Sequence, residues 1–279
     1  ISTDRRRWWL INCSPDFGTQ WNDLLREHPH AQLQGVMLTD AQLDHIGGLF
    51  SLRETLAPVP AYVTPEAFAH MKACGLANLF EACGAVRFRV LKYGAHISLD
   101  FHVTMWLLPM LGRVPRYATH LTDSGGEGGV DGGVAGMASA LLVKKDGCAR
   151  TQLVYAPSMV SFEGPLAQQV TKSDAFLFDG SFFTSTEMIR LALGSRRAED
   201  MGHAPVNETL HKFIQLDLHK AAQPLKICTH LNNTNPCLDP DAHFDGQTYL
   251  RHANVVIASD GKEFYLPCTD DVGGAEDSA

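Results

Sequence analysis

The sequence predicts an α/β protein with two mixed β-sheets and helices on their outer faces, and three observations support this fold class. Hydrophobic residues make up 45% of the 279 residues and charged residues 19%, an ordinary globular composition on a chain long enough for a large core. Short apolar runs alternate with amphipathic stretches. An Asp-Gly pair between two apolar runs also indicates an antiparallel hairpin.

The first half of the chain contains strand-like runs separated by amphipathic segments. The runs that predict strands are residues 7–12, 33–38, 60–64, 86–94 and 100–109. Residues 17–28 are amphipathic, and Pro65 suits the first turn of a helix continuing to residue 80, because no N–H is needed there. We therefore expect helices between these strands.

The second half repeats this alternation and adds hairpins. The runs that predict strands are residues 138–145, 151–157, 174–180 and 224–230. Residues 160–172 and 206–217 predict helices. The sequence "KDGCAR" links the first two of these strands as a hairpin, and the Asp-Gly pair inside residues 254–266 predicts a second hairpin that closes the chain.

Charge and cysteine usage limit the function classes. The formal net charge of −8 argues against a nucleic-acid partner, because phosphate binding needs a basic face. The sequence shows no signal peptide and no run of eighteen apolar residues, so we expect a cytoplasmic protein with no membrane partner. The seven cysteines include no Cys-x-x-Cys pair, which predicts reduced thiols rather than a disulfide framework.

The domain organisation is expected to be simple. Residues 1–269 are predicted to form a single domain, and the acidic, small-residue-rich tail 270–279 is predicted to be disordered. The glycine-dense segment 124–136 lacks the strand and helix that flank a phosphate-binding loop, so it predicts a mobile loop. A homodimer is a possible oligomeric state.

The segment "MLTDAQLDHIGG" (37–48) places polar side chains directly after an apolar strand. One interpretation is structural, because Thr39 and Gln42 have the spacing of a helix capping box and the aspartates suit a helix N-terminus. The other interpretation is a binding site, since α/β folds place their sites at the ends of strands. The remainder of the chain decides between them.

Potential metal ligands recur after predicted strands. A single histidine is more often a surface or core residue, but a repeated position at strand ends favours a shared site, because strand ends at one edge of a sheet converge. The candidate ligands at these positions, or in glycine-flanked loops, are Asp44, His45, His120, Asp179, His203 and His230.

These motifs resemble those of a known superfamily. The sequence "TDAQLDHIGGL" is similar to the metallo-β-lactamase signature His-x-His-x-Asp-His, with Asp40 and Gln42 where the first two histidines usually stand. Together with "NCSPDF", "GLFSLRE", "YAP", "FDGSFF", "DMGH" and "HLNNTNP", it resembles the pyrroloquinoline quinone (PQQ) biosynthesis protein B family from Asn12 to about Asp260. The resemblance implies the metallo-β-lactamase αββα four-layer sandwich, and iron-dependent hydroxylation of a tyrosine ring in a small peptide precursor of PQQ.

The sequence departs from this family in two places. Family members carry, ahead of the matched residues, a further strand, a glycine-rich turn and a cysteine cluster that binds structural zinc. The sequence here starts after all three, so we expect either a shortened relative or a chain from which that part is missing. The glycine-rich segment 124–136 is also longer than expected. Either difference is compatible with a paralogue that has another substrate.

The altered signature changes the predicted metal chemistry. Gln is a poor transition-metal ligand, so the first of the superfamily's two metal sites should be weak or empty. The second site keeps Asp44, His45 and His230, and the resemblance places Asp179 and His203 nearby as further ligands. Two histidines and one carboxylate with open positions are typical of non-haem Fe(II) oxygenases. We expect Fe(II), with zinc as the other candidate, and O2 as co-substrate.

Other residues have predicted roles around this ion. His203 is either a ligand or an acid–base group for phenol deprotonation, and Asp179 is a second catalytic candidate. Arg196 and Arg197 either clamp substrate carboxylates or form a solvated loop. The asparagines of "HLNNTNP" either fix the loop after His230 or are plain turn formers. The candidates for substrate contact are Asp40, Gln42, His120, Arg196, Arg197 and Asn233.

Three functions remain open on the sequence alone. The leading hypothesis is an Fe(II)- and O2-dependent hydroxylase that acts on a tyrosine-like small molecule or short peptide. A mononuclear zinc metallohydrolase with Asp179 positioned for water activation is the second enzyme candidate. The third is a non-enzymatic carrier of PQQ or a related quinone.

Overall fold

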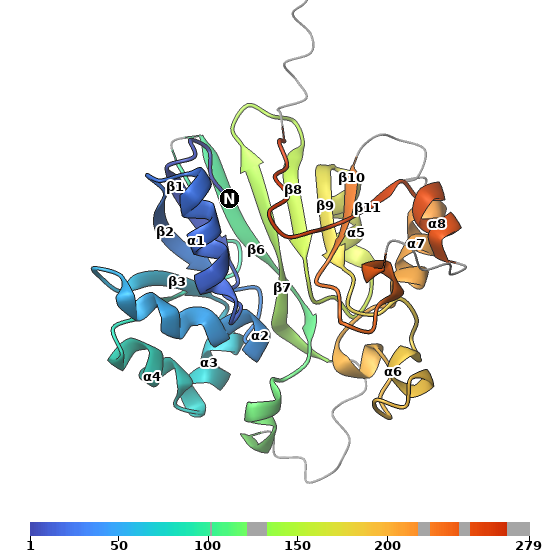
Figure 1. Ribbon diagram of the computed structural model, residues 1–279, viewed down its shortest axis with the longest axis horizontal. Coiled ribbons are helices and arrows are strands. Elements are labelled where there is room, and N and C mark those ends of the chain that lie inside the picture. Colours follow the sequence, from blue (N-terminus) through green and yellow to red (C-terminus); the bar gives the residue numbers. More distant parts are fainter. Residues whose placement is uncertain (101, 122–132, 217–223, 240–245, 267–279) are drawn as a thin grey trace, which may run out of the picture. The chain divides into compact units, whose positions relative to one another are not determined.

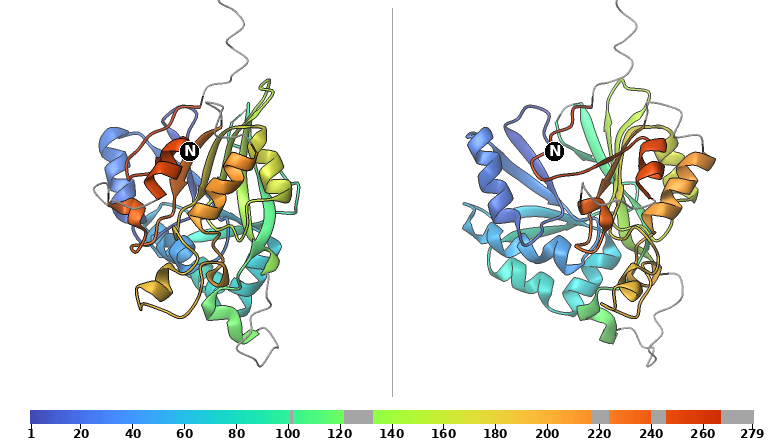
Figure 2. Two further views of the ribbon diagram at one scale, coloured as in Figure 1. Left: turned by 90° about the vertical axis from the view of Figure 1, so that its right-hand side faces the viewer. Right: turned by 45° about the vertical axis from the view of Figure 1, so that its right-hand side comes forward.

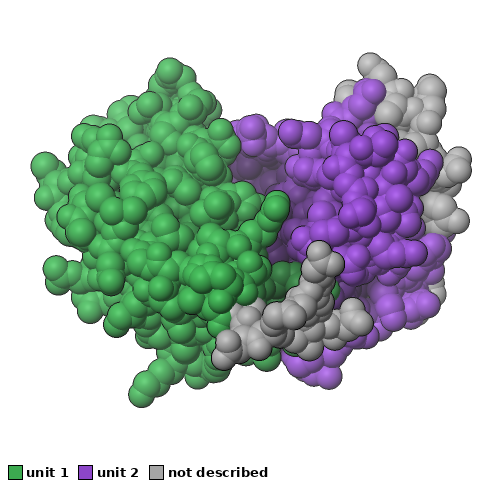
Figure 3. Space-filling view, turned by 90° about the horizontal axis from the view of Figure 1, so that it is seen from below, with its two compact units in different colours: residues 1–95, 107–140 green, residues 96–106, 141–279 purple. Residues whose placement is uncertain are grey.

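The computed structural model of the protein describes residues 1–100, 102–121, 133–216, 224–239 and 246–266. The chain divides into two units, which consist of residues 1–95 with 107–140 and of residues 96–106 with 141–279 (Figure 3). The predicted single domain over residues 1–269 stays a prediction. The tail predicted to be disordered, 270–279, lies outside the described residues.

The first unit contains a four-stranded sheet in the order β1-β2-β3-β4 (Figure 1). Its strands are β1 (Arg7–Ile11), β2 (Gln32–Met37), β3 (Val59–Val63) and β4 (Val86–Val90). All three neighbouring pairs are parallel, whereas the sequence predicted a mixed sheet. The parallel order has a simple cause: each connection contains a helix that returns the chain to the same end of the sheet.

Helices cover this sheet and share one hydrophobic core with it. They are α1 (Phe17–Glu27), α2 (Leu43–Ile46), η1 (Gly47–Glu54), α3 (Pro65–Ala73), α4 (Leu76–Ala82) and η2 (Arg116–Leu121). Phe17 of α1, Met71 of α3 and Phe80 of α4 pack in the same core cluster as Val36 and Ala61 of the sheet. In the right-hand view of Figure 2, the blue and cyan helices of this unit lie along the blue strands of the sheet. As predicted, Pro65 lies at the start of α3, where Thr64 caps the helix.

Close backbone packing fixes the segment that carries the predicted site. Gly48 N–H donates to Cys13 O at 2.9 Å, and a Cβ atom at Gly48 would lie 1.9 Å from Ser14 O. Because both neighbours are backbone atoms, neither can move aside without displacing the chain after β1. Only glycine therefore lets η1 pack against this chain segment.

We expect Gly48→Ala to lower the free energy of unfolding by about 1–3 kcal/mol or more, since overpacking a rigid contact forces backbone shifts. Gly18→Ala is the matched control, because nothing lies within 4 Å of a Cβ at that helical position. The control should leave stability unchanged or raise it by up to about 1 kcal/mol. Urea unfolding measures both, and equal stability of the two variants would contradict this account of Gly48.

The second sheet has seven strands in the order β11-β10-β9-β8-β7-β6-β5. Its strands are β5 (Ile97–Ser98), β6 (Val103–Gly112), β7 (Val134–Lys145), β8 (Thr151–Ala156), β9 (Ser173–Asp179), β10 (Leu225–Thr229) and β11 (Val255–Ile257). The β7–β8 pair is antiparallel, which confirms the predicted hairpin, while β8, β9, β10 and β11 pair in parallel. This sheet is mixed, as the sequence predicted.

The second unit also contains helices. They are α5 (Gly164–Thr171), α6 (Glu187–Arg190), η3 (Glu199–Met201), α7 (Val206–Gln215), η4 (Pro236–Leu238) and α8 (Gly246–His252). Of these, α5, α7 and α8 contact strands of the second sheet. Phe213 of α7 packs edge-on against Phe176 and Phe178 of β9 and against Phe162. These aromatic contacts anchor β9, the strand whose last residue is Asp179.

Three sequence predictions are corrected by the structure. The predicted second hairpin is wrong, because β11 pairs in parallel with β10 after the crossover through α8, and residues 262–266 form no strand. In the segment predicted to be a mobile loop, Val134–Gly136 begins β7, and residues 122–132 lie outside the described part. Cys148 is disulfide-bonded, so the predicted reduced state is wrong there. Cysteine pairing depends on distances in the folded chain, which spacing alone does not reveal.

Among the helices in the described residues, none combines the length and the apolar character needed to cross a bilayer.

Candidate metal centre

The first polar cluster lies where two parallel strands of the first unit end. Asn12 follows β1 with a left-handed backbone (φ 56°), and Thr39 follows β2. The Asn12 side chain donates to Thr39 Oγ1 and accepts from Thr39 N, both at 2.9 Å. Both residues are buried, so these bonds fix the start of "TDAQLDH". Thr39 is therefore committed to Asn12 and does not cap α2, which begins after Gln42 without a side-chain cap.

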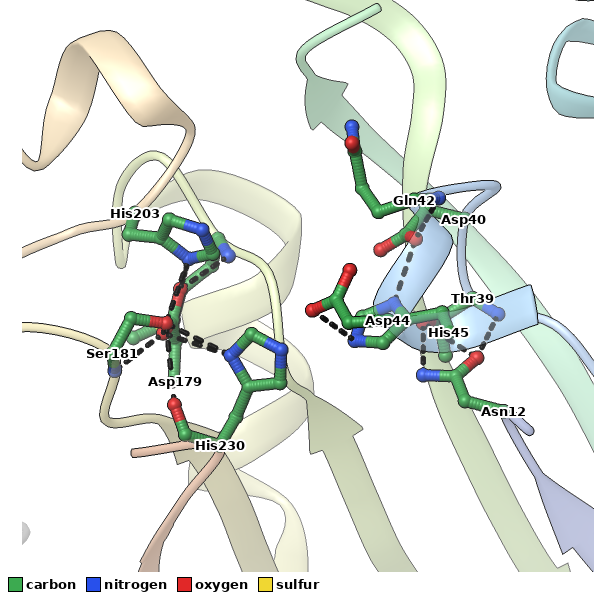
Figure 4. A network of polar contacts seen from close by, with 11 residues as sticks. Asn12, Thr39, Asp40, Gln42, Asp44, His45, Asp179, Ser181, His203 and His230 are labelled. Carbon is green, nitrogen blue, oxygen red and sulfur yellow. Dashed lines mark hydrogen bonds and ion pairs between the residues drawn. The ribbon is translucent and has the colours of Figure 1, made fainter. Parts of the chain in front are cut away.

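Asp40 and His45 form a buried pair in this cluster (Figure 4). His45 Nδ1 lies 2.7 Å from Asp40 Oδ1, and the same oxygen accepts a hydrogen bond from Gln42 N. Burial by itself raises the pKa of Asp40, but the charge of His45 and the hydrogen bonds from His45 and Gln42 outweigh it and lower the pKa. Asp40 is thus an ionised acceptor, which places the imidazole proton on Nδ1 and the lone pair on Nε2.

Asp44 lies beside the other nitrogen of the same ring. Its Oδ2 is 3.8 Å from His45 Nε2, and its side chain is 62% exposed. Two ligand atoms that each lie about 2.0–2.2 Å from one ion are at most about 4.4 Å apart. The Asp44 carboxylate and His45 Nε2 therefore fit a shared metal ion, with Asp40 orienting the ring from behind.

The remaining predicted residues of the first unit have other contacts. Gln42 Nε2 donates to Arg113 O at 3.0 Å, so its amide is used to hold the chain. Tyr117 of η2 donates to Ala41 O at 2.8 Å and braces the same segment. His120 is exposed on η2, and it belongs to none of the groups of potential ligand atoms found among the described residues. The predicted substrate roles of Gln42 and His120 stay predictions.

The second polar cluster lies where β9 and β10 of the second unit end. Asp179 is the last residue of β9, Ser181 follows it after Gly180, and His230 directly follows β10. The two strand ends approach so closely that a Cβ at Gly180 would lie 2.6 Å from Thr229 O. Gly180 N–H donates to that oxygen at 2.7 Å. Glycine at this position therefore allows Ser181 and His230 to meet.

The Asp179 carboxylate organises the second cluster (Figure 4). Oδ1 accepts from Ser181 N at 2.9 Å and Ser181 Oγ at 2.7 Å, and Oδ2 accepts from Met159 N at 3.1 Å and His203 Nδ1 at 2.7 Å. Burial alone raises the pKa of Asp179, but the charge and hydrogen bond of His203, with His230 and Ser181, outweigh it and lower the pKa. A carboxylate has about four acceptor positions, and here four donors fill them.

Replacing Asp179 with asparagine should lower the free energy of unfolding at pH 7 by about 2–4 kcal/mol, because the new NH2 group faces buried donors. The pKa of Asp179 is depressed in the folded protein, so its contribution is complete above the unfolded value of about 3.9 and is lost as the pH falls further. The gap between wild type and variant should therefore narrow below about pH 4. Asp44→Asn is the control, with an expected change within about 0.5 kcal/mol at this exposed site. Equal unfolding midpoints for the two variants would contradict the role of Asp179.

The loop after His230 is fastened by its asparagines, as one of the two sequence interpretations predicted. Asn235 is buried, donates to Gly180 O at 2.5 Å and accepts from Cys237 N at 2.9 Å. Asn232 donates to Thr234 Oγ1 at 2.7 Å. Asn233, by contrast, is exposed, and its predicted contact with substrate stays a prediction.

The two asparagines provide a matched comparison. Asn235→Ala leaves Gly180 O and Cys237 N without their partner, so we expect a loss of about 1–3 kcal/mol in the free energy of unfolding. Asn233→Ala should change it by no more than about 0.5 kcal/mol, as is usual at an exposed position. Thermal or urea unfolding measures both, and a larger loss in Asn233→Ala than in Asn235→Ala would refute this assignment.

The arginine pair braces the loop that leads to His203. Arg196 donates to Asp200 O, and Arg197 N–H donates to Asp200 Oδ2 at 3.0 Å. Both side chains are exposed. The structure thus shows contacts within the loop, and the predicted clamp on substrate carboxylates stays a prediction.

Each unit brings part of the predicted ligand set together. In the second unit, Asp179, His203 and His230 each have one potential ligand atom within 4.8 Å of the others. In the first unit, Asp44 and His45 adjoin, and Asp40 orients the ring. That all five residues serve one ion stays a prediction.

Sequence reasoning missed Ser181, whose hydroxyl lies at the centre of the second cluster. Its Oγ is within 3.0 Å of both His203 Nδ1 and His230 Nδ1. The only signal was its place in "FDGSFF", two residues after a strand-end aspartate. Asn12 was missed for a similar reason, since its partner Thr39 is 27 residues away in the chain.

Comparison with known proteins now identifies the fold. The Beta-lactamase superfamily domain matches residues 7–230, most of the chain. The chain belongs to the β-lactamase superfamily. Its curated relatives include coenzyme PQQ synthesis protein B of Acinetobacter baumannii (strain AYE), 27% identical over 95% of this chain and 86% of the relative. The same protein of Nitrosococcus oceani is 28% identical with the same coverage.

A solved structure agrees with these relatives. The crystal structure of Zn2+-bound PqqB from Methylobacterium extorquens has a TM-score of 0.76 at 23% identity, and the match covers 95% of this chain and 86% of that one. The predicted metallo-β-lactamase fold class and the resemblance to the PQQ protein B family are both confirmed. Within the superfamily, this chain is a PqqB-like member.

Proposed function

We propose that the protein is a non-haem Fe(II)-dependent hydroxylase of a tyrosine-like residue or short peptide in the biosynthesis of PQQ or a related cofactor. One oxygen atom of O2 would enter the ring C–H bond as a hydroxyl group, and the other would leave as water. The two electrons and two protons for that water come from an ene-diol or hydroquinone reductant. The curated relatives, which are PQQ synthesis proteins, support this class of substrate.

The observation that carries the proposal is that the side chains of Asp40 and Gln42 bind other groups of the protein. These residues stand at the first two histidine positions of the superfamily signature, and both side chains are engaged elsewhere. Asp40 orients His45, and Gln42 holds Arg113 O. The first metal site of a two-metal hydrolase thus lacks its usual ligands, which favours a single ion and oxidative chemistry.

The donor chemistry of three residues suits one such ion. We assign its ligands as Asp44, His45 and His230, two imidazoles and one carboxylate. His45 carries its lone pair on Nε2, 3.8 Å from Asp44 Oδ2, which suits adjacent ligands. When bound, Fe(II) supplies the redox chemistry that activates O2. The filled acceptor positions of Asp179 favour an orienting role for this residue over a ligand role.

His203 is best suited to proton transfer. Its Nδ1 donates to Asp179 Oδ2 at 2.7 Å, so Nε2 carries the lone pair that can accept a phenol proton. The buried Asp179 carboxylate then stabilises the imidazolium that forms. A deprotonated phenol ring is richer in electrons at its ortho carbons, where hydroxylation takes place.

A mononuclear zinc hydrolase is the second candidate, because His and carboxylate ligands suit zinc as well as iron. The solved relative from Methylobacterium extorquens holds Zn2+, and this observation favours the alternative. A quinone carrier is a third, and it differs from both enzymes in needing no turnover.

Oxygen uptake by iron-loaded protein tests the proposal. With Glu-Tyr and ascorbate, we expect O2 consumption that depends on the peptide, and a product heavier by one oxygen atom. Zinc-loaded protein is the control and should consume none. Ester or phosphoester cleavage by the zinc form, with no peptide-dependent O2 loss in the iron form, would reject the hydroxylase in favour of the hydrolase.

A further inference from the structure

The Ser181 hydroxyl lies among more hydrogen-bonding partners than it can satisfy as a donor. Its Oγ is 2.7 Å from Asp179 Oδ1, 2.8 Å from His230 Nδ1, 3.0 Å from His203 Nδ1 and 3.2 Å from His230 O. A serine has one O–H proton and two acceptor lone pairs. The direction of each hydrogen bond therefore depends on which of the four partners accepts that proton.

Ser181 donates its hydroxyl hydrogen bond to the Asp179 carboxylate. The carboxylate is ionised and is the strongest acceptor of the four, and its 2.7 Å separation from Ser181 Oγ is the usual length of an O–H···O bond. His203 Nδ1 already donates its own proton to Asp179 Oδ2 at 2.7 Å, so it has no lone pair to offer. The Ser181 oxygen consequently acts as an acceptor toward His230 Nδ1, 2.8 Å away.

His230 Nδ1 is linked to the Asp179 carboxylate through Ser181, whereas the other two histidines each contact a carboxylate directly through Nδ1. His45 reaches Asp40, and His203 reaches Asp179, each at 2.7 Å. His230 Nδ1 is 3.9 Å from Asp179 Oδ1, which is too long for a hydrogen bond. Ser181 Oγ fills this gap, because it is within bonding distance of both groups.

We propose that Ser181 is a positioning residue that connects the Asp179 carboxylate to His230 and keeps that imidazole protonated on Nδ1. The lone pair of His230 is then fixed on Nε2, the atom that would bind a metal. Neutral histidine in water favours the opposite tautomer, with the proton on Nε2, so the protein has to impose this one. The part of this inference that concerns metal binding rests on the proposed function, whereas the tautomer does not.

The backbone supports this three-residue relay. Gly180 N–H donates to Thr229 O at 2.7 Å, and Asn232 N–H donates to Ser181 O at 3.1 Å, so hydrogen bonds on either side hold Ser181 against the chain around His230. His230 has a left-handed backbone (φ 57°), which is uncommon for a residue with a side chain. Ser181 is buried, which excludes solvent as the usual partner of its hydroxyl.

Long-range 1H–15N correlation spectra of the histidine side chains test the relay in the full chain without metal. Wild type should show His230 protonated on Nδ1. In Ser181→Ala we expect His230 to shift toward the Nε2-protonated form, while His203, still bonded to Asp179, keeps its proton on Nδ1. Ser185→Ala is the matched control: it removes a hydroxyl that donates to Glu199 instead, and it should leave both rings unchanged.

The affinity for Co2+ supplies an independent second readout. Loss of an orienting partner typically lowers metal affinity about 10–100-fold, and we expect Ser181→Ala to fall in this range. If Ser181→Ala does not fold, Ser181→Gly gives the same test, because it also removes the hydroxyl. A wild-type tautomer pattern in the variant would overturn the relay. A changed tautomer with unchanged Co2+ affinity would uphold the relay and instead reject His230 as a ligand.

Discussion

Replacing His45 with alanine is expected to reduce bound iron from about one per chain to a trace and to abolish peptide-dependent O2 uptake. The variant loses a ligand whose ring is held by a buried carboxylate at 2.7 Å, and it retains the exposed carboxylate of Asp44 together with His230. A site that retains two of three ligands binds a divalent ion far more weakly. Metal analysis after anaerobic reconstitution measures the loss directly.

His120→Ala is the control for this experiment, because His120 is an exposed histidine of the same unit outside the cluster. It should keep the wild-type metal content. Binding of PQQ to His45→Ala separates the enzyme from a carrier, since a carrier that does not need the ion should still bind the quinone. Full iron content in His45→Ala would refute the assigned ligand set.

Replacing His203 with asparagine is expected to lower the turnover number about 100–10,000-fold, the usual contribution of a general base. An asparagine NH2 group lies near the position of the histidine Nδ1, so it can still donate to Asp179 Oδ2. The variant therefore keeps the buried hydrogen bond and removes only the nitrogen that would accept the phenol proton. Single-turnover assays at saturating peptide measure the loss.

The metal content of His203→Asn distinguishes the two predicted roles of this residue. Unchanged iron together with a low turnover number supports proton transfer. A variant that has lost its iron would show that His203 is a ligand, and the acid–base assignment would then be wrong. Circular dichroism melting should show little change in either case, because the bond to Asp179 is preserved.

The fold was predictable where periodic patterns are strong. Apolar runs placed most of the strands, and Pro65 marked the start of α3. The direction of the strands was harder to predict. Alternating and continuous apolar patterns indicate a strand, but they do not indicate which strands pair or whether a pair is parallel. The parallel first sheet and the parallel partner of β11 both depend on crossovers that only the folded chain reveals.

The site was predictable to the extent that ligand-type residues follow strands in order. Asp44, His45, Asp179 and His230 stood out by this placement, but their orienting partners did not. Ser181 and Asn12 are ordinary polar residues whose roles depend on close approaches, such as that between Gly180 and Thr229 O. Asp40 is buried against His45, a contact that the sequence did not reveal, and its predicted contact with substrate stays a prediction.

A metal count on the protein as purified without oxygen tests the central claim most directly. We predict one iron per chain, because Asp40 and Gln42 are engaged in orienting and holding the chain and leave ligands for a single ion. Two zinc ions per chain, with no iron, would contradict this account. Such a result would favour a two-metal hydrolase like those of the wider superfamily.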